Sequence, residues 1–378
     1  MAATALAVIF GGNIMAQSNA KNAGTLPVKM EKLNLTKKWD KVFPKSDKVD
    51  HKKVTFHNRF GITLAADMYT PKVVSTGGAG NSVASSTTGS GKLPAIAVSG
   101  PFGAVKEQSS GLYAQAMAER GYVAIAFDPS FTGESGGYPR DTNSPDINTD
   151  DFQSAVDFLS TQENVDPDRI GIIGICGWGG MALNIAALDT RIKATAAITM
   201  YDMSRVTAFG YYDSMDEDAR YEARKALNAQ RTAEYKKGVY EKPVTDINAP
   251  TPDDAPQFVK DYAAYYAPYG RAYHPRSLNF NRGWLSDASS SLVNTKLLAF
   301  SQEIRSPVLI VHGENAHSRY FGEDAFKNMT TGTGEKWAAN KELYIVPGAS
   351  HTDLYDGGAD HNKIPWSKIE EFFKKNFK

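Results

Sequence analysis

The segment from Arg169 to Gly180, with the sequence RIGIIGICGWGG, constrains the fold more than any other part of the chain. Its first seven residues are mostly isoleucine and glycine, which is typical of a short buried β-strand. The glycines that follow Cys176 favour a tight turn and the start of a helix. A side chain at such a turn stands above the end of a sheet, and the next backbone N–H, that of Gly177, points to where negative charge develops in acyl transfer. Cys176 is therefore the candidate nucleophile, and the alternative is a small buried residue that closes the strand.

Trp178 departs from the usual glycine spacing around such a turn, because the glycines follow at Gly179 and Gly180. An indole at this position must either point away from the turn or form a wall of the substrate pocket. We predict that Trp178 is a substrate-binding residue.

A candidate base for the thiol lies near the C-terminus. Residues 341–355 are typical of a strand followed by a Pro-Gly turn, and the turn carries His351. From such a turn the imidazole can reach the end of the sheet, accept the thiol proton and lower the pKa of Cys176. A lone loop histidine is more often a surface residue, but the strand, the turn and the terminal helix expected after them favour a catalytic role.

A carboxylate that orients the imidazole is expected after the strand at residues 307–313. Glu314 is the first carboxylate there and is the preferred candidate. Asp202 follows the strand expected at residues 193–200 and is the alternative, and an ordinary solvated carboxylate is the plain interpretation of either. His317 is predicted to lie in the pocket or behind the catalytic residues rather than to bind a metal.

A second backbone donor for the oxyanion is expected in the loop after the strand that begins at Leu93. The sequence Gly-Pro-Phe-Gly at residues 100–103 permits a close approach of the backbone, so Phe102 or Gly103 is predicted to donate. The alternative is a plain Gly-Pro turn.

Four segments together resemble the α/β-hydrolase superfamily, namely residues 58–71, 103–108, 127–137 and 174–180. More narrowly, they are similar to the branch of dienelactone hydrolases and Xaa-Pro-peptidase-like acyl hydrolases, in which cysteine can replace serine. The resemblance implies an α/β-hydrolase fold and a triad of Cys176, His351 and a carboxylate.

Strand and helix patterns alternate along the chain, which indicates a mostly parallel central sheet with helices on both faces. The alternation stops in residues 203–306, where a helical lid insert is expected above the site. The hydrolase core is therefore assigned to residues 50–202 and 307–378, after an N-terminal extension at residues 17–49.

Residues 1–16 contain an apolar run followed by small residues, which resembles a secretory signal peptide although the basic start is missing. Export to the bacterial periplasm or beyond is expected, and a cytoplasmic location is the alternative. The single cysteine excludes an intrachain disulfide and leaves the compartment open.

The chain carries 42 basic and 42 acidic residues and no basic run, so nucleic acid and a stable membrane association are not expected. The seven histidines lack metal-ligand spacing, and no dinucleotide-binding or P-loop glycine pattern occurs, so no metal and no cofactor are expected. Nothing in the sequence specifies an oligomeric state.

The expected function is hydrolysis of an ester, lactone, thioester or related acyl bond of a small-molecule substrate through an acyl-enzyme. The alternatives are an acyltransferase that uses the same acyl-enzyme, and a catalytically inactive hydrolase fold used for binding.

Overall fold

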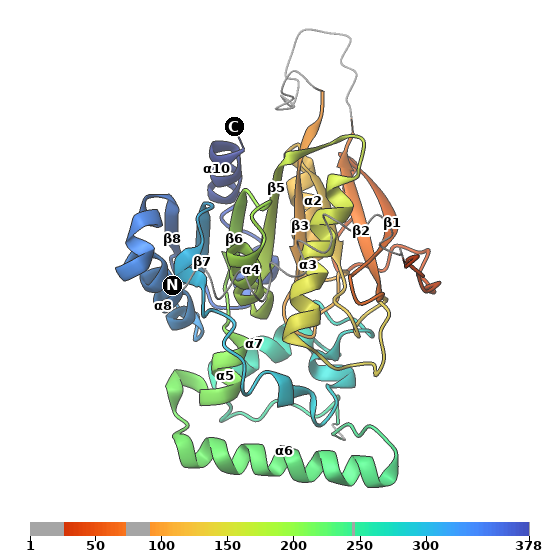
Figure 1. Cartoon of the computed structure of the whole chain (residues 1–378), viewed down its shortest axis with the longest axis vertical. Helices are drawn as coiled ribbons and strands as arrows, with labels where there is room; N and C mark the ends of the chain where they lie inside the picture. Colours follow the sequence, from red (N-terminus) through yellow and green to blue (C-terminus); the bar gives the residue numbers. More distant parts are fainter. Residues whose placement is uncertain (1–25, 73–90, 244–245, 378) are drawn as a thin grey trace, which may run out of the picture. The chain divides into compact units, whose positions relative to one another are not determined.

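A mostly parallel sheet forms the centre of the structure, a computed structural model that describes residues 26–72, 91–243 and 246–377. Its strand order is β1-β2-β4-β3-β5-β6-β7-β8 (Figure 1). The pairs β1/β2 and β2/β4 are antiparallel, and the remaining neighbours are parallel. The strands are β1 (Val49–His57), β2 (Thr63–Pro71), β3 (Leu93–Ser99), β4 (Val123–Phe127), β5 (Val165–Ile175), β6 (Ala194–Ile198), β7 (Val308–Gly313) and β8 (Lys341–Val346).

Helices cover both faces of this sheet, because alternate residues of the central strands are apolar on each side. Ile96 of β3 belongs to the hydrophobic cluster that includes α2 (Ser109–Glu119) and α10 (Trp366–Asn376). Ala95 belongs to the opposite cluster, with α3 (Pro145–Ser160) and α4 (Gly177–Leu188). The predicted α/β-hydrolase architecture is confirmed.

The segment between β6 and β7 is helical and lies beyond the carboxyl ends of the parallel strands (Figure 1). It contains α5 (Met203–Phe209), α6 (Glu217–Lys237) and α7 (Gln257–Tyr266). Asp216 caps α6 by accepting a hydrogen bond from the backbone of Ala219, and Gly238 ends the helix in a left-handed conformation.

Short helical segments make up most of the remaining regular structure. They include α8 (Arg319–Thr330) after β7, α9 (Asp353–Asp356) after β8, a longer 3₁₀-helix at Gly332–Asn340, and single turns at Tyr211–Asp213, Leu278–Arg282, Ala288–Ser291 and Ser301–Glu303. None of the helices in the described ranges is long and apolar enough to cross a lipid bilayer.

The N-terminal residues fall into two parts. The signal peptide predicted at residues 1–16 lies outside the described residues. Residues 26–30 belong to a separate unit and contain no helix or strand, whereas Glu31–Lys378 forms one compact unit. Within the larger unit Phe43 is buried, and the backbone N–H of Val42 donates to the carbonyl of Glu107, so residues before β1 pack against the core.

Candidate active site

Cys176 occupies a strained turn between β5 and α4. Its φ of 58° and ψ of −124° are unfavourable for a residue with a Cβ, and such conformations persist where the surrounding structure holds them. The turn is so tight that a Cβ added to Gly174 would lie 2.0 Å from the carbonyl oxygen of Trp178. The backbone of Cys176 is consequently held at the carboxyl end of the sheet.

Four groups bond to the sulfur of Cys176. Two are the hydroxyls of Tyr355 and Tyr262, and two are the backbone N–H groups of Gly177 and Phe102. Burial raises the pKa of the thiol, and these four contacts partly oppose that effect. The net pKa is raised, so the resting group is a neutral thiol, and the two backbone N–H groups are the donors in place for a thiolate.

Gly103, the other predicted oxyanion donor, binds the insert through its carbonyl oxygen. This oxygen accepts hydrogen bonds from the backbone of Leu278 and the hydroxyl of Ser277, at 2.7 and 3.1 Å. The amide that bonds to the sulfur is that of Phe102, one residue earlier. Gly103 therefore links the loop to the insert, and its role as an oxyanion donor stays a prediction.

His351 lies in the turn between β8 and α9 and has hydroxyl partners on both ring nitrogens. Nε2 is 2.9 Å from the hydroxyl of Tyr355, and Nδ1 is 2.8 Å from Thr199 Oγ1 and 2.6 Å from Ser318 Oγ. Burial, followed by the neighbouring His317 and His312, lowers the pKa of His351 well below its usual range. The imidazole is therefore neutral, and Tyr355 stands between it and the thiol.

Neither predicted carboxylate reaches His351. The backbone N–H of Glu314 donates to the carbonyl of Val346, which extends the pairing of β7 with β8, and its exposed side chain accepts from the backbone of Gly348 at 2.8 Å. Asp202 caps α5 by accepting from the backbone of Arg205 at 3.0 Å. Both assignments are corrected: in the described part of the chain no carboxylate bonds to His351.

Thr199 and Ser318 take the position where a triad acid was expected. Thr199 follows β6 directly and has a φ of 43°, a strained value for a β-branched residue. Ser318 precedes α8, and its hydroxyl bonds to His351 instead of capping that helix. The sequence could have indicated these two residues only through their positions, a threonine at the end of a strand and a serine at the start of a helix.

This arrangement predicts that Thr199 and Ser318 orient the imidazole of His351 and that Glu314 does not, which mutations can test. Glu314→Gln should change kcat on an aryl ester by less than about threefold, because its carboxylate does not orient the imidazole. The double variant Thr199→Val with Ser318→Ala should lower kcat by about tenfold to a hundredfold, because the imidazole loses the partners that fix its tautomer.

Thr195→Val is the matched control, since Thr195 lies in β6, the strand that Thr199 follows, and its buried hydroxyl has no hydrogen-bond partner among the described residues. A large loss in Glu314→Gln with full activity in the double variant would contradict the structural assignment.

The histidines also predict how stability depends on pH. Burial lowers the pKa values of four of them, namely His274, His312 (to about 3), His317 (to about 4) and His351. Their neutral forms stabilise the fold above the unfolded-state pKa of about 6.5, and this contribution is lost as the pH falls below it. Asp128 and Asp151 act in the opposite direction, because burial raises their pKa values, that of Asp151 to about 6.

Unfolding should therefore take up protons as the pH falls from about 6.5 towards 5, because the four histidines gain protons only in the unfolded chain and outnumber the two aspartates. The free energy of unfolding should fall over that interval, by on the order of 1 kcal/mol per pH unit for each net proton taken up. Urea unfolding followed by fluorescence at the two pH values measures this slope. A flat or rising stability towards pH 5 would show that the buried histidines are not neutral.

A cavity of about 260 Å³ opens in front of the sulfur. Its lining is mostly aromatic and contains no carboxylate, lysine or arginine: Pro101, Phe102, Cys176, Tyr201, Met203, Val206, Tyr211, Tyr262, Tyr266, Asn279, Phe280, Trp284 and Tyr355. Within it the hydroxyls of Tyr211, Tyr201 and Tyr262 form a chain with 3.2 Å spacings. Residues from the core and from the insert together shape this cavity.

The remaining predicted site residues lie outside the cavity lining. Trp178 is buried against Phe127 and Phe152, because the first turn of α4 directs it into the core, and its assignment as a substrate contact is corrected. His317 stacks on Phe258 with ring centroids 4.3 Å apart and bonds to the hydroxyl of Tyr201. Across residues 26–72, 91–243 and 246–377, no cluster of histidine, cysteine and acidic side chains has the arrangement of a metal site.

Comparison with known proteins places this chain in a wider group. A sequence model of the family described as X-Pro dipeptidyl-peptidase (S15 family) matches residues 61–352. An uncharacterised protein of Pseudomonas aeruginosa, PA2218, is 49% identical over 347 residues, which are 91% of this chain and 85% of that protein. The crystal structure of PA2218 matches with a TM-score of 0.80 over 92% of this chain and 99% of that one.

Two more distant relatives carry descriptive names. The thiohydrolase aneE of Aspergillus aculeatus is 32% identical over 140 residues, which are 37% of this chain and 43% of that protein. The structure of the α/β hydrolase GrgF from Penicillium sp. sh18 matches with a TM-score of 0.63 at 19% identity, over 87% of this chain and 99% of that one, and supports the fold alone.

Proposed function

The chain belongs to the X-Pro dipeptidyl-peptidase (S15) family, and we propose that it hydrolyses an uncharged ester or thioester through an acyl-enzyme on Cys176. The observation that carries this proposal is the pair of backbone N–H groups beside the sulfur. The amides of Gly177 and Phe102 come from two different loops and bond to the sulfur, which places them to donate to the carbonyl oxygen of an acyl group attached there. A binding protein with no catalytic role would have no use for a strained, donor-surrounded thiol beneath an open cavity.

Acylation begins from the neutral thiol. Sγ bonds to the substrate carbonyl carbon while the thiol proton passes to the Tyr355 oxygen and the Tyr355 proton passes to Nε2 of His351, 2.9 Å away. The carbonyl oxygen takes the electron pair and is held by the amides of Gly177 and Phe102. The bond to the leaving group then breaks, and the leaving group takes the proton back along the same path. The product is a thioester between the acyl group and Cys176.

Deacylation reverses the roles. Water gives a proton through Tyr355 to His351 as its oxygen attacks the thioester carbon. The C–S bond then breaks, and the sulfur recovers the proton, which releases a carboxylic acid and restores the thiol. The Tyr355 hydroxyl is therefore protonated at the start and at the end of each half-reaction.

The hydroxyls of Thr199 and Ser318 set the direction of this transfer. In the resting imidazole, Nδ1–H donates to one of these oxygens, which leaves Nε2 free to accept from Tyr355. After transfer the imidazolium keeps a hydroxyl partner on Nδ1 and the Tyr355 oxygen on Nε2. Without a carboxylate this cation is weakly stabilised, so it is suited to a brief intermediate rather than to a resting ion pair.

The cavity lining favours an uncharged acyl group. A dipeptide substrate with a free amino terminus would need a carboxylate to pair with its ammonium, and the lining residues include none. Aromatic walls suit an apolar or flat acyl chain, and the similarity to a thiohydrolase supports a thioester among the acyl bonds considered.

Intact-protein mass spectrometry tests the proposal directly. The protein would be mixed with para-nitrophenyl esters of increasing chain length, N-acetylcysteamine thioesters of the same acids, and glycyl-prolyl para-nitroanilide. We expect turnover of the esters or thioesters and a transient acyl mass that peptide mapping locates on Cys176. Turnover of the anilide alone, or ester hydrolysis without an acyl adduct, would overturn the proposal. Added alcohol or amine that intercepts the adduct in preference to water would indicate an acyltransferase.

A further inference from the structure

The insert between β6 and β7 is bonded to the loop that carries the Phe102 amide. Asn279 donates from Nδ2 to the carbonyl oxygen of Phe102 at 2.9 Å. The backbone of Leu278 and the hydroxyl of Ser277 both bind the next carbonyl, that of Gly103. The carbonyl groups of two consecutive residues, Phe102 and Gly103, are therefore held by three consecutive residues of the insert.

The fit between the two segments is close. Gly103 has a φ of 85°, and a Cβ at this position would lie 2.8 Å from Oδ1 of Asn279. The ring of Phe102 stacks on Trp284 of the insert with centroids 4.5 Å apart and an interplanar angle of 22°. The backbone and the side chain of Phe102 thus both depend on where the insert lies.

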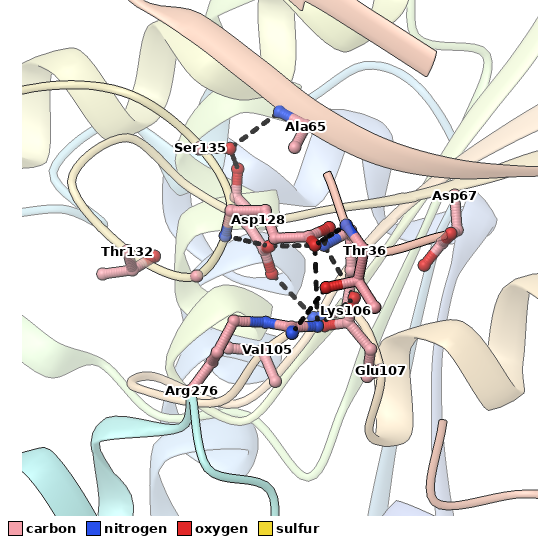
Figure 2. Close-up of polar contacts among 12 residues, drawn as sticks. Thr36, Ala65, Asp67, Val105, Lys106, Glu107, Asp128, Thr132, Ser135 and Arg276 are labelled. Atoms are coloured by element: carbon pink, nitrogen blue, oxygen red, sulfur yellow. Dashed lines mark hydrogen bonds and ion pairs between the residues drawn. The ribbon is translucent and has the colours of Figure 1, made fainter. Parts of the chain in front are cut away.

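A buried ion cluster around Lys106 follows in the same loop, and Figure 2 shows its polar contacts. The Nζ atom of Lys106 lies 2.7 Å from Asp128, 2.7 Å from Glu134 and 2.8 Å from Glu107. The backbone N–H of Lys106 also donates to Asp128 at 2.8 Å. Burial alone would lower the pKa of Lys106, but the carboxylates raise it well above its usual range, so the ammonium stays charged.

Arg276 connects this cluster to the insert. Its guanidinium lies 2.8 Å from Glu107 and 2.7 Å from Asp40, and it donates to the hydroxyl of Thr36 at 3.1 Å. Arg276 directly precedes the three insert residues that bind the loop. Removing one partner of a buried ionic network leaves the others uncompensated, so such a network fixes the backbone that carries it.

We propose that Asn279 and Arg276 are positioning residues that hold the Phe102 amide against the sulfur of Cys176, so that the insert completes the oxyanion site as well as covering it. The inference rests on the proposed function, because it assigns a role to that oxyanion site. It predicts that a small displacement of the insert switches off acyl chemistry without removing the nucleophile or the base.

Asn279→Ala tests the contact to Phe102. We expect kcat on a para-nitrophenyl ester to fall about tenfold to a hundredfold with KM within about twofold, because an oxyanion donor acts in the transition state. The rate of Cys176 alkylation by iodoacetamide rises with pH, and the midpoint of this rise should move to higher pH because the thiolate loses a hydrogen-bond donor. The matched control is Asn281→Ala, since Asn281 bonds to the carbonyl of Pro275 in the same insert and not to the loop.

Arg276→Met tests the link to the ion cluster, with Arg231→Met as its control because Arg231 forms a 3.7 Å exposed pair with Asp287. The same loss of kcat and the same alkylation shift are expected in Arg276→Met. If this variant fails to fold, Asn279→Ala decides the matter on its own. An Asn279→Ala protein with kcat within about twofold of wild type and an unchanged alkylation midpoint would overturn the inference.

The two proposals fail in different ways. If the wild-type protein hydrolyses none of the esters or thioesters, the proposed function fails, but the alkylation midpoint still reports whether Asn279 holds the Phe102 amide at the sulfur. A raised KM with an unchanged alkylation midpoint would instead make Asn279 a substrate contact of the cavity that it lines, and would overturn the positioning role.

Discussion

Cys176→Ala is expected to lower ester or thioester turnover by about 10⁴-fold or more, because it removes the nucleophile on which both half-reactions depend. The fold should persist, since alanine keeps the Cβ that the turn at φ 58° already accommodates. Initial rates with a para-nitrophenyl ester measure the first effect, and thermal unfolding measures the second. Cys176→Ser should retain weak activity at most, because a hydroxyl needs stronger base assistance than a thiol and His351 has no carboxylate behind it.

The chain has one cysteine, so thiol-directed reagents report on this position alone. Alkylation of wild type should block turnover in proportion to the label incorporated. Substantial hydrolysis by a folded, homogeneous Cys176→Ala protein would show that another residue or bound water carries the reaction.

Sequence patterns predict well those elements that are determined by residues close to them in the chain. The apolar run of β5 and the glycines around Cys176 determine a strand, a turn and a helix within twelve residues. The Pro-Gly turn after β8 similarly predicts where His351 lies, and the Gly-Pro-Phe-Gly loop predicts a close backbone approach at Phe102. In each case the determining residues and the site residue are neighbours in the chain.

The partners of His351 could not be predicted in this way. Thr199 is separated from it by 152 residues and Ser318 by 33, and they meet at its Nδ1 atom because β6, β7 and β8 are adjacent in the sheet. A carboxylate was expected because carboxylates usually fill this position, and Glu314 was the first available. Its backbone pairing with Val346 instead directs the side chain to solvent.

The contacts that the insert makes with the site could not be predicted from the sequence. The pattern of residues 203–306 predicts a helical lid above the site and no more. The structure brings Tyr262 of α7 to the sulfur and Asn279 to the Phe102 carbonyl. A residue pattern reveals that a segment is amphipathic, but not which backbone groups of a distant loop it will bind.

Tyr355 could have been predicted from the sequence, because it lies only four residues after His351, in the short helix α9 that follows the turn. Its hydroxyl is 2.9 Å from Nε2 and also faces the thiol, so the proposed proton path passes through it. Tyr355→Phe should therefore lower kcat at neutral pH by about a hundredfold or more, the usual scale of general acid–base assistance. The phenyl ring keeps the packing of Tyr355 against Tyr265, whose centroid lies 5.0 Å away.

The measurement pairs ester turnover with the pH dependence of iodoacetamide labelling in Tyr355→Phe and in the control Tyr265→Phe. Tyr265 is equally buried and adjacent, but it does not line the cavity. Loss of the relay should raise the pKa of Cys176 and move the labelling midpoint upward along with the fall in kcat, whereas the control should resemble wild type. A Tyr355→Phe protein with equal or higher turnover would contradict the relay, because it would mean that the phenol separates a thiol and an imidazole that react faster in direct contact.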